Sequence, residues 1–303
     1  MKLSVIVTLV DGGAALRRCL TSLESQEGAP PLEIIVPYDA TVGDMSVFEQ
    51  EFPSCRFING GTLTSRTDPY SFSGQHELFD RRRAVGLAEA TGDLVGMVED
   101  RGVPRPDWAA KIVRAHEAPH ACVGGGVENG RDRILNWAVY FCDFGRYQPP
   151  FEPRVAPYVT DVNLAYKRSA LNTTRAEWSQ RYHETSVHWA LQRAGETLWL
   201  TPDIVVDQIR DDLSLKRLLA ERVAWGRLFA YTRAREVSSA KRIALTLLAP
   251  VLPLVLFARL ARQRLAKRVS RSSFLKASLA VAVLLMAWSF GEMLGYATGR
   301  EQR

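Results

Sequence analysis

The sequence predicts an α/β domain with a mostly parallel sheet and flanking helices, followed by hydrophobic helices near the C-terminal end. Short uncharged apolar runs alternate with segments of helical periodicity over the first two thirds of the chain, which is typical of a parallel sheet covered on both faces. The 303 residues are 47% hydrophobic and 24% charged, so the chain can bury a sizeable core. Two uncharged stretches, 243–258 and 277–291, follow this alternating part.

The predicted elements follow one another from the first residues. The run 3–10 predicts a strand, and the spacing of Leu16, Leu20 and Leu23 predicts a helix over 14–23. Further strands are expected over 32–36, 94–98 and 121–127, and further helices over 76–90, 107–117 and 184–194.

Acidic residues follow two of the predicted strands. Asp39 comes after the strand 32–36, and Glu99 and Asp100 come after the strand 94–98. Ligands bind beyond the carboxyl ends of the strands in such sheets. We therefore expect these side chains to share a site, although acids also end strands at ordinary solvated loops.

Several classes of protein are excluded by missing motifs. The chain has no GxGxxG after its first strand and no GxxxxGK[ST] phosphate loop, so dinucleotide binding and P-loop chemistry are not expected. The four cysteines are widely spaced without a CxxC pair, which argues against a zinc ribbon or a disulfide framework.

The net charge of +6 comes from one end of the chain. Residues 243–303 carry nine Lys/Arg and two acids, whereas residues 1–242 carry 30 basic and 31 acidic residues. Cations woven between apolar stretches favour a membrane surface over nucleic acid as partner. We expect no nucleic-acid partner.

Five segments in order resemble the family 2 glycosyltransferases, whose catalytic domain has the GT-A fold. They are SVIVTLVDGGAALRRCLTSLESQ from residue 4, LEIIVPYDAT from residue 32, an arginine helix, Gly-Asp strand and acidic motif in RRRAVGLAEATGDLVGMVEDRGVPRPDW from residue 81, and NLAYKR from residue 163. The resemblance covers about residues 3 to 210.

The resemblance implies roles for individual residues. Asp39 would touch the nucleobase or ribose of a sugar nucleotide, and Arg83 would lie near the diphosphate. Glu99, Asp100 and Arg101 would face the donor sugar and diphosphate. Glu184 would be the catalytic base with Asp100 beside it in the catalytic site, and Asn163 and Tyr166 would bind the acceptor.

The chain departs from the family pattern in three places. Thr8-Leu9 replaces the usual Pro-Thr, Glu99-Asp100-Arg101 replaces an Asp-rich triplet, and Gln208 stands where a late histidine is common. Magnesium or manganese needs only one or two protein carboxylates beside phosphate oxygens, and Asp100 could supply one. Alternatively, Arg101 could neutralise the diphosphate. The metal is therefore expected to be weakly required or absent.

Inverting transfer needs a carboxylate as general base on the acceptor hydroxyl and positive charge on the leaving group. Glu184 fits the base, although an acid at a helix start also suits the helix dipole, and Asp161 is the second choice. A run of charged residues usually lies on the solvated face of a helix, so at least two of Arg81, Arg82 and Arg83 are expected there. His183 and His188 do not share a helical face and are not expected to bind metal.

We expect a catalytic domain over 1–212, an amphipathic helical connector over 213–242 and membrane-associated hydrophobic helices over 243–303. The 16 residues of 243–258 and the 15 of 277–291 reach roughly 24 and 22 Å, short of the ~30 Å hydrocarbon core; continuing to residue 299 makes the second long enough. Pro250 and Pro253 are expected to break the first segment.

Seven cations and no acid lie between these segments, at 259–276, and they favour the cytoplasmic side. The first segment is thus expected to be re-entrant or interfacial, and the second either spans or also dips in. A soluble helical hairpin is the alternative.

The sequence therefore predicts an inverting glycosyltransferase at the cytoplasmic face of a membrane, moving sugar from a nucleotide-sugar donor to a lipid-linked or glycan acceptor. The alternatives are a non-catalytic sugar-nucleotide-binding or scaffold protein and, more remotely, a soluble nucleotidyltransferase.

Overall fold

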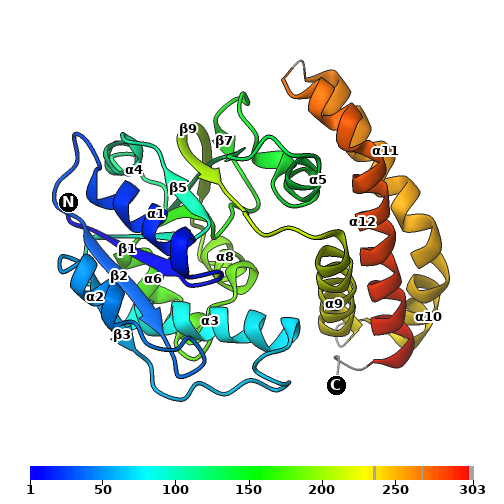
Figure 1. The fold of residues 1–303 in the computed structure, drawn as a ribbon, viewed down its shortest axis with the longest axis horizontal. Helices are drawn as coiled ribbons and strands as arrows, with labels where there is room; N and C mark the ends of the chain where they lie inside the picture. The colour runs from blue at the N-terminus through cyan, green and yellow to red at the C-terminus, as the bar shows by residue number, and fades with distance from the viewer. Residues whose placement is uncertain (235–236, 268, 300–303) are drawn as a thin grey trace. The chain divides into compact units, whose positions relative to one another are not determined.

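The computed structural model describes residues 1–234, 237–267 and 269–299. The chain divides into two compact units, each drawn in Figure 1. The first comprises residues 1–65, 76–130 and 147–209, and the second comprises residues 66–75, 131–146 and 210–303. The predicted division at 212 and 242 remains a prediction.

The first unit is built on one sheet, which has nine strands in the described part of the chain. They are β1 Leu3–Thr8, β2 Glu33–Tyr38, β3 Arg56–Asn59, β4 Leu94–Glu99, β5 Gly102–Pro104, β6 Cys122–Asn129, β7 Arg154–Val155, β8 Asn163–Lys167 and β9 Leu198–Gln208. Their order is β3-β2-β1-β4-β8-β6-β9-β5, and β7 pairs with β9.

The sheet is parallel on one side and mixed on the other. Strands β3, β2, β1 and β4 are parallel, and β6 is parallel to β9. Strand β8 runs antiparallel to both β4 and β6, with Asn163 opposite Val98. The predicted α/β class is confirmed, but the sheet is less uniformly parallel than predicted. One consequence matters for the site: β8 begins where β4 ends.

The helices of the first unit are α1 Gly13–Glu24, α2 Ser46–Glu51, α3 Phe72–Glu89, α4 Trp108–Ala115, α6 Arg168–Thr173, α7 Arg175–Trp178 and α8 Glu184–Arg193. The first turn of α3 falls in the second unit, and this helix begins four residues earlier than predicted. A short 3-10 helix, η1, covers Gly145–Tyr147.

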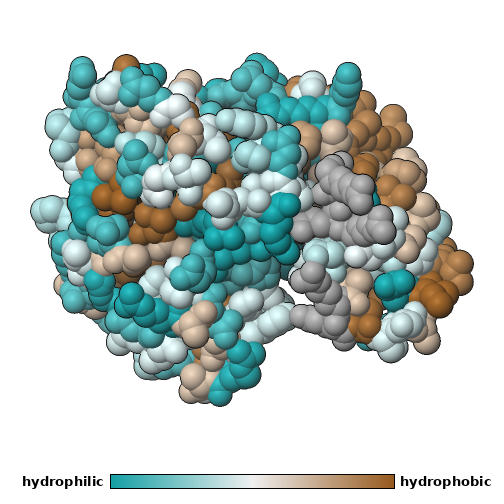
Figure 2. All heavy atoms as spheres, turned by 90° about the horizontal axis from the view of Figure 1, so that it is seen from below, coloured by the Kyte–Doolittle hydropathy of each residue, from teal (hydrophilic) through white to brown (hydrophobic). Residues whose placement is uncertain are grey.

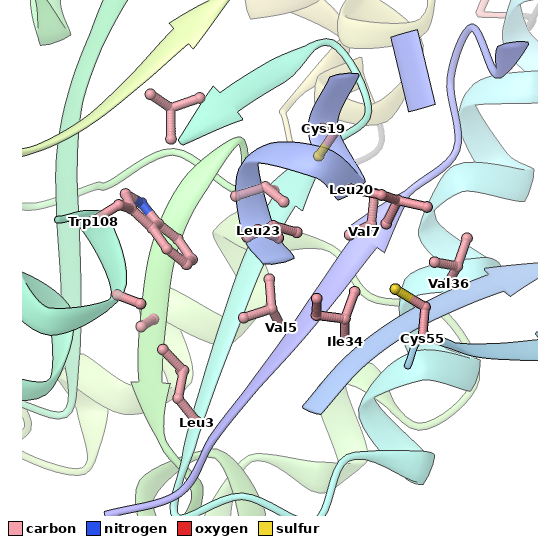
Figure 3. Packing of buried hydrophobic residues seen from close by; sticks show 14 of the residues in the cluster. Leu3, Val5, Val7, Cys19, Leu20, Leu23, Ile34, Val36, Cys55 and Trp108 are labelled. Atoms are coloured by element: carbon pink, nitrogen blue, oxygen red, sulfur yellow. The ribbon is translucent and has the colours of Figure 1, made fainter. Parts of the chain in front are cut away.

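The core forms where α1 packs on the sheet. Leu16, Leu20 and Leu23 are buried in one cluster with residues of β1 and β2. Figure 3 shows Leu20 and Leu23 beside Val5 and Val7 of β1. Each fully buried Leu or Val contributes roughly 1.5–3 kcal/mol relative to an exposed one. The regular apolar spacing that predicts the helix therefore also holds it in place.

Helix α3 lies directly on the sheet because Gly86 has no side chain. A Cβ at Gly86 would be 2.8 Å from Cγ2 of Ile6 and 3.2 Å from Cγ of Pro37. This close approach places the preceding turn, with Arg82 and Arg83, beside the carboxyl ends of β1 and β2.

The second unit is helical in its described part. Its helices are α5 Ile134–Asp143, α9 Leu215–Ala234, α10 Ser239–Leu248, the 3-10 turn η2 Ala249–Val251, α11 Leu252–Ala266 and α12 Arg271–Thr298. Helix α12 packs against α9, α5, α10 and α11. Arg268 of the predicted cationic stretch and residues 300–303 lie outside the described residues.

One prediction for this unit is wrong. A single helix over 213–242 is not formed, because α9 ends at Ala234 and α10 begins at Ser239, where the hydroxyl of Ser238 caps the backbone N–H of Lys241.

The prolines interrupt the α-helix of the first apolar segment, as predicted, because the 3-10 turn η2 separates α10 from α11. The helical stretch nevertheless continues to Ala266. Pro250 and Pro253 lie near the starts of η2 and α11, where no helical N–H is required.

Two helical stretches of the described chain are consequently long and apolar enough to cross a membrane. They are Ser239–Ala266, which comprises α10, η2 and α11, and Arg271–Thr298, with 28 residues each. At about 1.5 Å per residue each is roughly 42 Å long, so the expected lengths of 24 and 22 Å were too short. The helices continue beyond the uncharged runs into their charged flanks.

Candidate active site

Four carboxylates gather at the carboxyl ends of β1 and β4. Glu99 ends β4, and Asp161 comes just before β8, whose first residue lies opposite Val98. Glu184 begins α8, and Asp80 lies on α3. The antiparallel placement of β8 thus brings Asp161 beside Glu99, although the two lie far apart in the sequence.

Arg83 is the centre of this group. Its guanidinium lies 3.0 Å from Oδ2 of Asp161, 3.2 Å from Oε1 of Glu99 and 3.3 Å from Oδ1 of Asp80. Its Nε donates to the hydroxyl of Thr8 at 3.0 Å. Burial alone would lower the pKa of Arg83, but these carboxylates raise it above its ordinary value. Arg83 therefore stays charged and holds three acids in place.

Glu184 and Asp161 form an adjacent acid pair. The backbone N–H of Asp161 donates to Oε2 of Glu184 at 2.9 Å. Burial, reinforced by the charge of Asp161, raises the pKa of Glu184 well above its ordinary value. A carboxylate with a raised pKa is a better proton acceptor near neutral pH, so this pair has the chemistry of a general base.

The other face of the acid pair is backed by a buried hydroxyl network. Tyr166 accepts or donates a hydrogen bond of 2.8 Å with Tyr182 and one of 2.9 Å with Nε2 of His188. Burial lowers the pKa of His188 to about 4, so its imidazole is neutral. Burial, together with the charges of Asp161 and Glu184, raises the pKa of Tyr182, so the network lies within electrostatic range of the pair.

Asp100 holds the loop after β1. Its Oδ2 accepts backbone hydrogen bonds from Val10, Asp11 and Gly12 at 3.0, 2.9 and 2.6 Å. Its Oδ1 is buried and has no hydrogen-bond partner. Burial raises the pKa of Asp100 to about 7. Gly12 has a φ of 65°, a conformation that favours glycine, and it lets the three N–H groups converge on one oxygen.

Arg101 is held by the same loop. Its Nε and Nη2 lie 2.8 and 2.6 Å from the two carboxylate oxygens of Asp11. This bidentate pair leaves 10% of the Arg101 side chain exposed and 30% of the Asp11 side chain. The guanidinium thus lies at the edge of the site with its charge matched by Asp11.

Asp39 forms a buried ion pair with Arg82. The Nη2 of Arg82 lies 2.9 Å from Oδ1 of Asp39, and Nη1 donates to the carbonyl oxygen of Leu9 at 3.0 Å. Oδ2 of Asp39 is buried and has no hydrogen-bond partner. Asp39 lies at the predicted strand end, but it meets an arginine that the sequence analysis assigned to solvent.

The expectation for the arginine run is therefore wrong. Arg82 and Arg83 are 2% and 3% exposed, and only Arg81 is partly exposed. Both buried arginines have carboxylate partners. For Arg83 these partners outweigh burial and raise its pKa, whereas for Arg82 burial outweighs the charge of Asp39 and lowers its pKa.

The two predicted acceptor-binding residues are buried. The amide of Asn163 donates to the carbonyls of Gly126 and Ile204 and accepts from the indole of Trp108. Tyr166 belongs to the hydroxyl network, and both side chains are 0% exposed. Their contacts indicate positioning of β8 and do not support contact with an acceptor.

The residues present do not fit a full metal site. Within the described residues no group of three or more His, Cys, Asp or Glu side chains could hold a metal ion. Asp100 offers one free oxygen, Oδ1, while its neighbour Arg101 brings positive charge to the same place. We therefore derive no step through a metal ion.

Sequence reasoning missed Asp80, Thr8, Arg82 and Tyr182 as members of this site. The available signal was the run of three arginines that ends three residues before Gly86. A helix that lies close to a sheet turns part of its surface toward the sheet, so two of these three consecutive residues face inward. Asp161, the second choice for the base, lies in the centre of the group.

No protein-family model matches the chain, and no curated protein matches it. Among solved structures, the mannosyltransferase PcManGT from Pyrobaculum calidifontis, in complex with GDP-Man and Mn2+, is similar with a TM-score of 0.53 and 15% identity, covering 98% of this chain and 85% of that one. TarS 1–349 from S. aureus, in complex with UDP-GlcNAc, has a TM-score of 0.50 and 13% identity, covering 96% and 90%. At these identities the likeness shows the fold: the chain has the mixed α/β fold of these glycosyltransferases.

Proposed function

We propose that the protein is an inverting glycosyltransferase of the GT-A type that uses a nucleotide-sugar donor. The observation that carries this proposal is the Asp161 and Glu184 pair at the carboxyl ends of β1 and β4. The fold shared with PcManGT and TarS, whose structures contain GDP-Man and UDP-GlcNAc, supports the donor class.

In the proposed reaction Glu184 accepts the proton of the acceptor hydroxyl. That oxygen forms a bond to the anomeric carbon from one face while the bond to the diphosphate oxygen breaks on the other face. The electron pair of this bond leaves with the nucleoside diphosphate, so the anomeric configuration inverts. Asp161 orients Glu184 through its backbone N–H, and Arg83 fixes Asp161 and Glu99.

The donor would lie beyond the ends of β1, β2 and β4. Asp39 and its unpartnered Oδ2 face the nucleoside in this arrangement, while Glu99 and Asp100 face the sugar and diphosphate. Arg101 supplies the positive charge for the leaving group by moving from Asp11 to the diphosphate. Arg83 has three carboxylate partners already, so we assign it to positioning these acids, in place of the diphosphate role that the resemblance implies.

The proposed acceptor is membrane-associated, either lipid-linked or a glycan. Its support is the pair of apolar helices Ser239–Ala266 and Arg271–Thr298 together with the cations that surround them. The catalytic unit then works at the cytoplasmic face, where positively charged flanks are favoured.

The second candidate is a non-catalytic nucleotide-sugar-binding protein. It is favoured by the ion pairs that the cations of the donor site already form. Both cations nearest the donor site, Arg82 and Arg101, already have carboxylate partners in this structure. An enzyme must open at least the Arg101 pair to neutralise the leaving group. Turnover of any donor separates the two candidates.

The metal requirement has its own test. Since Asp100 offers a single oxygen and Arg101 can neutralise phosphate, we expect the wild type to keep most of its turnover in excess chelator. Arg101→Asp removes that cation and adds a carboxylate, so its residual turnover is expected to depend strongly on Mn2+. A wild type inactivated fully by chelator would contradict the role of Arg101.

The proposal as a whole is tested with a panel of UDP-, GDP- and dTDP-sugars. Full-length protein in detergent is incubated with each donor and with membrane lipid extract, and release of nucleoside diphosphate is measured. We expect one donor class to be consumed and the product linkage, read by NMR, to be inverted. Binding of a donor without turnover would support the second candidate.

A further inference from the structure

Helix α12 has one covered face and one exposed face. The covered face contains Phe274, Ala277, Val281, Leu284 and Tyr296, each 2% exposed or less. The exposed face contains Leu275, Leu279, Met286 and Phe290, each more than half exposed. The two sets recur with helical spacing, so α12 keeps an exposed apolar strip although α9, α5, α10 and α11 pack against the rest of it.

The covered face packs on helices that carry charge. Gly226 of α9 and Gly291 and Gly295 of α12 have no room for a Cβ, because it would meet the backbone of the other helix. Near the start of α12, Phe274 stacks edge-on against Phe141 of α5 at 5.4 Å between ring centroids. Backbone contact along this line fixes α12 to α9 and α5.

Charged groups on α9 exclude it from the centre of a bilayer. Arg222 forms two hydrogen bonds of 2.6 Å with Asp143 of α5, and Glu221 forms two with Arg210. Lys216, Arg217 and Arg233 of α9 are exposed. If α12 spanned the membrane with its packing intact, α9 and its charges would enter the hydrocarbon with it, which is strongly unfavourable.

The stretch Ser239–Ala266 presents an apolar face to the outside. Only 6% of its apolar window is buried, against 39% for α12. Its exposed large side chains include Ile243, Leu247, Leu248, Val251, Leu254 and Val255, which recur at helical spacing. Figure 2 shows hydrophobic side chains gathered over the C-terminal helices.

Cations border this apolar surface. Lys241 precedes it, Arg259 and Arg262 follow it, and Arg271 and Lys276 lie at the start of α12, all exposed. Between residues 239 and 299 the sequence has one acid, Glu292, which is buried and accepts from the indole of Trp288. The charge around the apolar face is thus of one sign and complements anionic lipid headgroups.

From these contacts we infer that neither helix crosses the bilayer. Ser239–Ala266 and α12 lie in one leaflet, parallel to the membrane, and their cations bind anionic headgroups on the side of the catalytic unit. A spanning hairpin would instead carry Lys267 and Arg271 to the opposite side, against the usual charge asymmetry. The inference rests on the membrane association proposed above and not on the transferase reaction.

Cysteine labelling of the full chain in sealed membrane vesicles tests this arrangement. Cys142 is replaced by serine because the other three cysteines are buried, and single cysteines are introduced as Ser272→Cys, Thr298→Cys and, in the catalytic unit, Ser179→Cys; all three positions are exposed. With an impermeant maleimide, we expect all three to react to the same extent before detergent is added. If Ser272→Cys or Thr298→Cys reacts only after detergent while Ser179→Cys reacts before it, a helix spans and the inference is wrong.

Vesicle sedimentation tests whether the cations bind anionic headgroups. We expect wild-type protein to bind vesicles of phosphatidylcholine with 30% phosphatidylglycerol at least tenfold more tightly than phosphatidylcholine alone. Arg259→Gln and Arg262→Gln should each weaken binding to the anionic vesicles about fivefold, whereas Arg193→Gln, an exposed site on α8, should not. Equal binding to both lipids would overturn the inference, as would a detergent-free soluble dimer that covers the apolar face and ignores vesicles.

None of these readouts needs a donor or turnover. The labelling pattern can therefore fail while the transferase reaction is demonstrated, and the reverse is equally possible.

Discussion

The two units treat buried charge differently. In the second unit two acids each have their own guanidinium: buried Glu221 of α9 pairs with Arg210, and half-buried Asp143 at the end of α5 pairs with Arg222, both through two hydrogen bonds. In the first unit Arg83 alone contacts three carboxylates, and Glu184 lies beside one of them.

The difference separates structural charge from functional charge. One-to-one pairs hold helices together without leaving excess charge in a place of low dielectric. A surplus of carboxylates raises the free energy of the folded state and is typical of a site where a proton or ligand is exchanged. The comparison therefore points to the Arg83 group as the reactive one, and each prediction below tests that contrast.

The largest effect is expected from removing the shared cation. Arg83→Met leaves Glu99 and Asp161 without the guanidinium that they contact and Asp80 with Arg181 alone, and we expect it to lower the free energy of unfolding by about 3–5 kcal/mol at pH 7.5. Arg222→Met leaves only Asp143 without its guanidinium, and Asp143 is 19% exposed. The decrease in the free energy of unfolding should therefore be smaller for this variant. Denaturant unfolding of both full-length variants in detergent measures this.

Acid should narrow the difference in stability between these two variants, because Glu99 and Glu184, whose pKa values are raised by burial, take up protons. Arg83→Lys should recover part of the stability. Equal losses for Arg83→Met and Arg222→Met would show that the site has no surplus charge.

A smaller effect is expected at Asp100. Its folded-state pKa of about 7 lies above the ordinary value of 3.8, so the folded chain keeps a proton that the unfolded chain has lost. Stability from this group therefore falls as the pH rises from about 4 to 7 and is level above that. Asp100→Asn removes the titration and keeps an oxygen for the three N–H groups of the loop.

Between pH 5 and pH 8 we expect the unfolding free energy of Asp100→Asn to rise relative to wild type by roughly 2–3 kcal/mol. Asp107→Asn, which alters the exposed acid directly before α4, should show no such rise. If the unfolding free energies of wild type and Asp100→Asn changed with pH in the same way, a buried charge at Asp100 would not explain its effect on stability.

The smallest effect is expected on the pH dependence of transfer. A base must lose its proton to act, and burial together with Asp161 raises the pKa of Glu184, so kcat should rise with pH through that raised value. Asp161→Asn removes the neighbouring negative charge and should move this limb about one pH unit to the acid side. An unshifted limb would show that the charge of Asp161 does not raise the pKa of Glu184, and a kcat reduced a hundredfold at every pH would assign the base to Asp161.

The strand ends and their acids could be predicted from the sequence, but their partners could not. Apolar runs locate Asp39, Glu99 and Asp100 at one edge because parallel strands share a direction. The pairs Arg82–Asp39 and Arg83–Asp161 join residues 43 and 78 positions apart, and no local pattern encodes such distances. The antiparallel course of β8, which sets the second pair, depends on which strands become neighbours.

Burial of the predicted acceptor residues was also hidden from the sequence. Asn163 and Tyr166 lie on a strand between β4 and β6, and both of its faces are covered. From the sequence alone, a polar side chain in a motif is expected to be exposed. Only the position of its strand within the sheet shows that it is buried. The same holds for the arginine run, because its burial depends on how closely Gly86 lets α3 approach the sheet.

The central claim is that Glu184 is the base of a glycosyl transfer, and one matched pair of variants tests it most directly. Glu184→Gln keeps the shape and can still accept the N–H of Asp161, whereas Glu177→Gln alters an exposed acid on α7. With the donor identified from the panel, kcat and donor affinity are measured for both. We expect Glu184→Gln to lose at least about a hundredfold in kcat with donor affinity nearly unchanged, and Glu177→Gln to match wild type. A Glu184→Gln enzyme that transfers sugar at the wild-type rate would contradict the account.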